Sequence, residues 1–81
     1  MLINYIQAAM HHGKYELMEN GRFFGNIPEC QGAWGEAATL EECRDELQSA
    51  LEDWIVFRLR QGMDVPGVDG IDLNPKKEYA E

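Results

Sequence analysis

The stretch KYELMENGRFFGNI, residues 14–27, decides the fold, because it holds two alternating segments separated by Asn20-Gly21. Asn and Gly tolerate the positive φ angles of a type I′ turn, so the pair predicts a β-hairpin with strands over 14–19 and 22–27. Pro28 ends the second strand because its nitrogen carries no hydrogen for the ladder. After a short loop, residues 33–37, AWGEA, fit a third antiparallel strand.

Two helices are predicted on either side of these strands. The first covers residues 2–12, where apolar residues recur at helical spacing and Gly13 follows as a C-cap. The second begins with Thr39-Leu40-Glu41-Glu42, which is a capping box. In this motif the Thr39 hydroxyl accepts a hydrogen bond from the Glu42 amide, and the Glu42 side chain accepts one from the Thr39 amide. It runs to Gln61, and Gly62 stops it. Its apolar face comprises Leu40, Cys43, Leu47, Ala50, Leu51 and Trp54.

The sequence therefore predicts an α+β fold in the order helix, three antiparallel strands and long helix. Residues 71–73 can add a short final strand after the turn chemistry at residues 65–70. We expect one domain over residues 1–75 and a charged tail over 76–81.

The two faces of the predicted sheet differ in composition. The face toward the long helix carries Tyr15, Leu17, Phe23, Gly25, Ile27, Ala33, Gly35 and Ala37, and the small residues of the third strand would let the helix approach closely. The opposite face carries Met18, Phe24 and Trp34, which is too apolar to be fully wetted. We expect either the first helix or a second copy of the chain to cover it.

The end of the long helix is apolar nearly all round, and such a helix has neighbours on every side. We therefore predict a homo-oligomer, a dimer or a tetramer. The candidate interface residues lie on the outer sheet face and at this helix end, and they are Phe24, Trp34, Trp54, Ile55, Val56, Phe57 and Leu59.

The charge is unusual, because 15 acidic residues against 7 basic ones give a net charge of −8 at pH 7. Nucleic-acid binding needs clustered Lys and Arg, so this balance argues against it. A basic protein partner would be attracted, although excess acid can also serve solubility alone. No stretch reaches the ~18 apolar residues of a membrane span, and the N-terminus does not read as a signal peptide. Two cysteines without metal spacing favour reduced thiols in the cytoplasm.

Residue chemistry gives no catalytic, cofactor or metal site. The serine and threonine residues are Thr39, which caps a helix, and Ser49, which lies within one. His11 and His12 point about 100° apart on a helix, and no nearby carboxylate is placed to orient either ring, so capping is favoured over metal binding. Cys30 could be exposed in its loop, but no basic neighbour in sequence lowers its pKa. We predict that the protein is not an enzyme.

Several motifs together resemble the HicB-like antitoxin family. They are the hairpin over residues 15–27, the loop Pro28-Glu29-Cys30-Gln31-Gly32, a strand around Trp34, and Thr39-Leu40-Glu41-Glu42-Cys43 opening a long helix. The first helix and the segment over 70–75 resemble short, stand-alone members of that family, so the resemblance covers nearly the whole chain.

The resemblance implies a partial ribonuclease-H-like fold and an antitoxin that blocks a small basic RNA-cleaving toxin, HicA-like in type. Many family members carry a C-terminal DNA-binding domain for which this chain has no room, so direct DNA binding is not expected. For a partner, the candidate contacts are the loop Glu29 to Gly32 and the acidic helix face, specifically Glu29, Cys30, Gln31, Glu41, Asp45 and Glu52. A solitary oligomeric module with a structural or regulatory role and no toxin is the alternative. Residual nuclease activity is a third reading, for which convergent carboxylates on the strands are missing.

Overall fold

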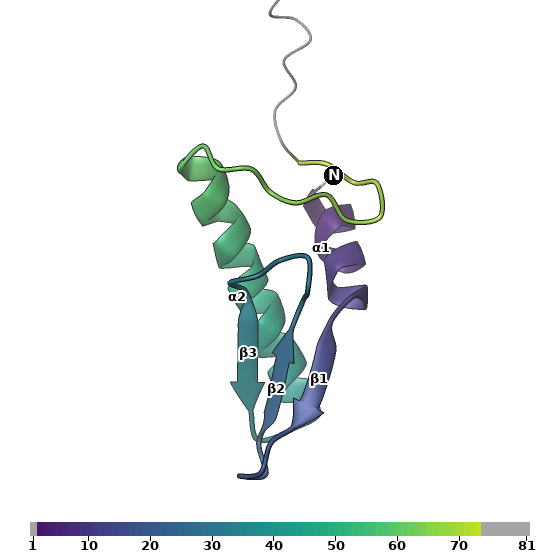
Figure 1. The fold of residues 1–81 in the computed structure, drawn as a ribbon, viewed down its shortest axis with the longest axis vertical. Coiled ribbons are helices and arrows are strands. Elements are labelled where there is room, and N and C mark those ends of the chain that lie inside the picture. Colours follow the sequence, from purple (N-terminus) through teal and green to yellow (C-terminus); the bar gives the residue numbers. More distant parts are fainter. Residues whose placement is uncertain (1, 74–81) are drawn as a thin grey trace, which may run out of the picture.

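The computed structural model describes residues 2–73 and has the predicted α+β order. Helix α1 (Leu2–His11) is followed by strands β1 (Lys14–Leu17), β2 (Phe23–Asn26) and β3 (Trp34–Ala37), and then by helix α2 (Leu40–Arg60). The three strands form one antiparallel sheet in the order β1-β2-β3 (Figure 1). Each element lies within a residue or two of its predicted bounds.

The hairpin turn differs from the predicted one. The Met18 amide donates to the Arg22 carbonyl at 2.8 Å, and the Gly21 amide donates to the Met18 carbonyl at 2.9 Å, so the loop has three residues. Gly21 has a positive φ of 84°, whereas Asn20 does not have a positive φ. A type I turn followed by one left-handed glycine fits these features, and the predicted two-residue type I′ turn is wrong.

Helix α2 packs across one face of the sheet, behind it in Figure 1. A Cβ atom on Gly35 would lie 2.5 Å from the Leu47 backbone nitrogen, so only glycine allows this approach. This confirms the prediction that small residues of β3 let the helix approach the sheet closely. The Thr39 hydroxyl accepts from the Glu42 amide at 3.1 Å, which confirms half of the capping box. The reciprocal bond from Glu42 does not form within residues 2–73.

Helix α1 does not cover the outer face of the sheet. It lies beyond the start of β1 and packs against α2, which leaves the front of the sheet in Figure 1 open. The Trp34 side chain is 54% exposed there and stacks on Phe24 with ring centroids 5.9 Å apart. Of the two covers that the sequence allowed, the first helix is therefore excluded.

The segment that follows α2 completes the core. Val65 and Val68 are fully buried against α1 and α2, together with residues of the β2–β3 loop. The predicted final strand at residues 71–73 is wrong, because this part of the chain forms only an isolated bridge between Val68 and Ile71. The predicted tail, 76–81, lies outside the described residues. Within residues 2–73, no helix is long and apolar enough to cross a membrane.

Candidate binding surface

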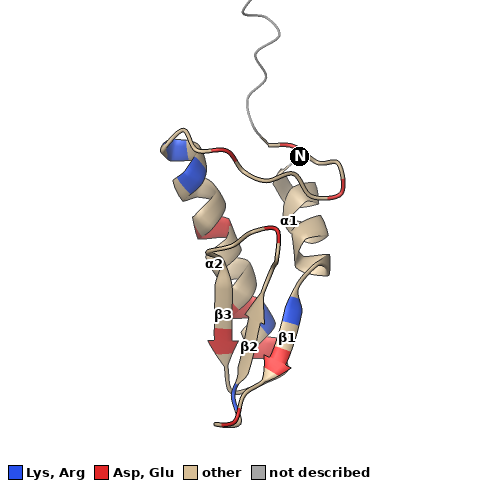
Figure 2. Cartoon of the chain, in the orientation of Figure 1, with Lys and Arg blue, Asp and Glu red and all other residues tan. Residues whose placement is uncertain are grey.

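The exposed side of α2 is strongly acidic (Figure 2). Its first turns begin at the positive end of the helix dipole, where Glu41 and Glu42 are favoured. The solvent-facing acids are Glu41, Glu42, Asp45, Glu46, Glu52 and Asp53. None of them forms an ion pair within the part of the chain that the structure describes, although Gln48 donates a hydrogen bond to Glu52 at 3.3 Å. The helix thus presents several uncompensated carboxylates to solvent.

A shallow groove of about 430 Å³ runs between β3 and α2, and we call it the β3–α2 groove. Trp34 and Glu36 line it from the strand, and Glu46 and Asp53 line it from the helix. Arg22 enters from the hairpin and donates to Glu36 at 2.9 Å. A neighbouring hollow of about 410 Å³ extends the acidic lining to Glu42 and Asp45. Among the described residues, Arg22 is the one basic side chain that lines this groove, where three acidic ones also lie.

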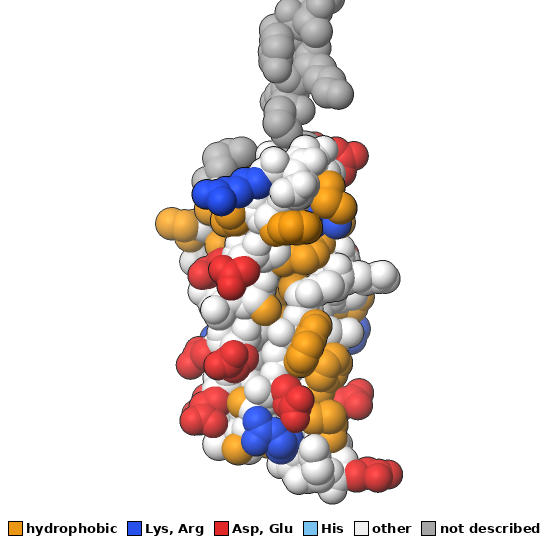
Figure 3. Space-filling view, turned by 90° about the vertical axis from the view of Figure 1, so that its left-hand side faces the viewer, with side chains coloured by type: hydrophobic (Ala, Val, Ile, Leu, Met, Phe, Trp, Pro, Cys, Tyr) orange, Lys and Arg blue, Asp and Glu red, His pale blue; other side chains and the backbone are white. Residues whose placement is uncertain are grey.

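The outer sheet face adjoins this groove. Figure 3 looks onto the side formed by α2 and the β3 edge, with acidic side chains along the helix and hydrophobic ones toward the open sheet face. Phe24 and Trp34 supply the stacked aromatic pair on that face. An exposed aromatic surface next to a row of carboxylates suits a macromolecular partner better than a small substrate.

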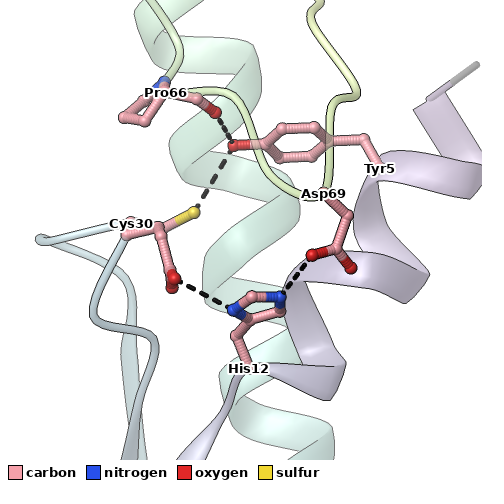
Figure 4. A network of polar contacts seen from close by, with 6 residues as sticks. Tyr5, His12, Cys30, Pro66 and Asp69 are labelled. Atoms are coloured by element: carbon pink, nitrogen blue, oxygen red, sulfur yellow. Dashed lines mark hydrogen bonds and ion pairs between the residues drawn. The ribbon is translucent and has the colours of Figure 1, made fainter.

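Just before β1 begins, His12 is held between two carboxylates, and we call this arrangement the His12 clasp (Figure 4). Its Nδ1 lies 2.9 Å from Glu29 Oε2, and its Nε2 lies 2.8 Å from Asp69 Oδ1. Hydrogen bonds to Asp69 and then to Glu29 raise the pKa of His12 above its usual 6.5. The expectation that no carboxylate orients this ring is wrong, because both partners are far away in sequence.

A buried tyrosine lies beside the clasp. The Tyr5 hydroxyl donates to the Pro66 carbonyl at 2.6 Å and lies 3.5 Å from Cys30 Sγ (Figure 4). Cys30 is fully buried, so the expectation that it could be exposed is wrong. Burial raises the pKa of this thiol, which keeps it protonated and unreactive. Within residues 2–73 no group of His, Cys, Asp or Glu is placed to hold a metal ion.

The predicted partner contacts separate into two groups. Gln31, Glu41, Asp45 and Glu52 are exposed and available. Glu29 is bound to His12, and the buried Cys30 cannot touch a partner. The β3–α2 groove adds three candidate contact residues that were not among the predicted partner contacts, namely Arg22, Glu46 and Asp53. The spacing of Glu46, Ser49 and Asp53 on one helical stripe was the available signal.

The predicted interface residues also separate. Ile55 is 1% exposed and packs within the chain's own core, so it is not a surface residue. Trp54 is half-buried, with the Arg58 guanidinium 5.1 Å from its ring centroid. At the end of α2, Val56, Phe57 and Leu59 are exposed. On the sheet, Trp34 is exposed and Phe24 is partly exposed.

Comparison with known proteins gives a family. A search of curated proteins finds no match. The crystal structure of TTHA0281 from Thermus thermophilus is similar to this chain, with 34% identity and a TM-score of 0.86, over 93% of this chain and 94% of that one. The model of the UPF0150-like family, an uncharacterised family related to HicB-like antitoxin modules, matches residues 4–66. The chain therefore belongs to the UPF0150-like family.

Proposed function

We propose that this protein is a HicB-like, antitoxin-type binding protein that acts in the cytoplasm without catalysis and neutralises a small basic RNA-cleaving protein. The observation that carries the proposal is the acidic side of α2, whose carboxylates have no cationic partner within residues 2–73. Such a surface speeds the encounter with a basic protein. The α+β arrangement of a helix across a three-stranded sheet is also compatible with a partial ribonuclease-H-like fold.

The absence of a catalytic role is part of this proposal. The two cysteines are buried, Thr39 caps α2, and the His12 imidazole is occupied by two carboxylates. These groups are engaged in contacts within the fold. A surface that works by covering a partner's active site needs no reactive group of its own.

The test uses a small basic RNA-cleaving protein encoded beside this chain. We expect the two purified proteins to form a complex and RNA cleavage to stop at a fixed molar ratio. Reversing two charges on α2, in the double variant Asp45→Lys and Glu52→Lys, should slow association at low salt on the order of tenfold. The double variant Glu19→Lys and Asp64→Lys, at exposed positions outside α2, is the control for net charge. Equal on-rates for all three proteins, or uninhibited RNA cleavage, would remove the support for the proposal.

A second function is favoured by the exposed apolar residues at the end of α2. Val56, Phe57 and Leu59 are 47%, 56% and 40% exposed, which is unusual for three neighbouring apolar side chains. In this alternative the chain is a solitary oligomeric module with a structural or regulatory role, and α2 ends pack between copies. Light scattering at micromolar concentration should then give a dimer or tetramer, and Phe57→Ser should give a monomer. A monomeric wild-type protein contradicts it.

A further inference from the structure

Strand β3 has a free edge within the described residues, because it pairs only with β2. The direction of its backbone groups follows from the hairpin. Met18 and Arg22 form a hydrogen-bonded pair, so hydrogen-bonded pairs in β1 and β2 recur at every second position from there. The β2 residues left to bond β3 are Phe23 and Gly25, whose partners are Ala37 and Gly35. The amides and carbonyls of Trp34 and Glu36 therefore point out from the edge.

The side chains beside this edge differ between its two faces. Gly35 faces α2, which makes room for the helix, so the side chains of Trp34 and Glu36 lie on the open side of the sheet and line the β3–α2 groove from that side. On the helix side, the nearest charged groups are Glu46 and Asp53 of the β3–α2 groove. A strand added at the edge would thus place alternate side chains over Trp34 and the others against carboxylates.

We propose that the β3 edge binds an extended segment of a basic partner, which adds a fourth antiparallel strand and directs basic side chains at every second position into the β3–α2 groove. This inference rests on the proposed binding function and assigns the surface and the type of segment it uses. Main-chain hydrogen bonds to Trp34 and Glu36 supply the pairing, and the alternation of apolar and basic side chains supplies the selectivity.

Charge identifies this occupant rather than a second copy of the chain. Pairing two β3 edges around a two-fold axis would bring Glu46 and Asp53 of one protomer toward the same residues of the other. Like charges would then face each other across an interface between two chains that each carry a net charge of −8. The other outer edge, on β1, is less acidic, because Lys14 offsets Glu16 on that strand and Arg44 is close to Tyr15. A basic segment is therefore favoured at the β3 edge over the β1 edge.

The experiment uses the full chain and a short blocked peptide that alternates lysine and valine. In the Trp54→Phe background Trp34 is the single tryptophan, so its fluorescence reports binding at the edge. The peptide residues directly opposite Trp34 and Glu36 would exchange main-chain hydrogen bonds with them and have their side chains on the same open face. Valine should therefore occupy these positions, and the lysine side chains should point to the helix side. Methylating the valine amides should abolish binding, whereas methylating the lysine amides should leave it intact.

Charge is tested by two double variants that each remove two negative charges. Glu46→Gln with Asp53→Asn should weaken binding about fivefold, as expected for two partly exposed ion pairs. Glu19→Gln with Asp64→Asn, at exposed positions away from the groove, should change it less than twofold. Equal weakening by both pairs, or equal binding of both methylated peptides, would overturn the inference. So would sedimentation that shows a dimer whose β3 amides are protected from hydrogen exchange by the second copy.

The two proposals can fail separately. A toxin that is inhibited equally well by the Glu46→Gln and Asp53→Asn variant leaves the antitoxin function standing and removes the assigned surface. A peptide that binds as described, combined with no inhibition of any basic ribonuclease, retains the surface and removes the antitoxin function.

Discussion

Carboxylates near the two outer strands of the sheet have opposite surroundings. Around His12, Glu29 and Asp69 are both bonded to one imidazole and join the β2–β3 loop, α1 and the segment after α2. Beside β3, Glu46 and Asp53 have no cationic partner within residues 2–73. The first pair of acids holds the chain together, and the second leaves its charge available to another molecule. This difference supports the proposal that the β3 side of the molecule binds a partner, whereas the acids around His12 stabilise the fold.

The packing of β3 against α2 can be disrupted most strongly at Gly35. An added methyl group would lie 2.5 Å from the Leu47 nitrogen, which belongs to helix backbone and cannot rotate away. We expect Gly35→Ala to lower the free energy of unfolding by about 3 kcal/mol, at the upper end for overpacking. Urea denaturation measures this change. Gly67→Ala is the control, because its added Cβ would be 3.5 Å from the Ile71 carbonyl and should cost less than about 0.5 kcal/mol. Equal losses in both variants would contradict the close approach of α2.

The packing beside the His12 clasp is tested through Tyr5. The Tyr5→Phe change removes the 2.6 Å hydrogen bond to Pro66 and should lower the free energy of unfolding by about 1–2 kcal/mol. Tyr15→Phe is the matched control, because no described residue forms a hydrogen bond of full geometry with the buried Tyr15 hydroxyl, although Arg44 lies near it. Its removal should be neutral or stabilising. If both variants lose the same stability, the Tyr5 bond does not anchor the segment after α2.

Sequence patterns predict the elements of this fold but not what joins them. The strands and α2 follow from alternation, a turn glycine and a capping threonine, all of which are local. The His12 clasp unites residues 17 and 57 positions apart, and no periodicity indicates such pairings. The segment around Val65 and Val68 reads as turns because of its Pro and Gly residues, yet both valines are buried.

The proposed binding surface could also be predicted only in part. Exposure of Glu41, Asp45 and Glu52 follows from helical periodicity, so it could be predicted. The groove between β3 and α2 depends on which strand lies at the edge and how close Gly35 brings the helix. Glu46 and Asp53 therefore became candidates only when the sheet order was known.

The smallest expected effect is the pH dependence of the clasp. Only the protonated imidazole has a hydrogen on both ring nitrogens, so the two bonds to Asp69 and Glu29 together favour the charged form and raise the pKa of His12. A raised folded-state pKa means that the stabilisation is fully present below the unfolded pKa of about 6.5. It is lost as the pH rises through the folded pKa. Since these side chains are 32–53% exposed, water screens the effect.

The clasp is therefore tested by comparing wild type with His12→Gln across that pH range. The wild-type advantage in unfolding free energy should be largest near pH 6 and should shrink steadily as the pH rises. His11→Gln is the control for removing an imidazole from the same turn of helix. The ring protons of His12 followed by NMR should titrate above 6.5, and at a lower pH in the Glu29→Gln variant. An unchanged titration in that variant would mean that Glu29 does not stabilise the charged ring, and the contrast with the unpaired acids beside β3 would then rest on Asp69 alone.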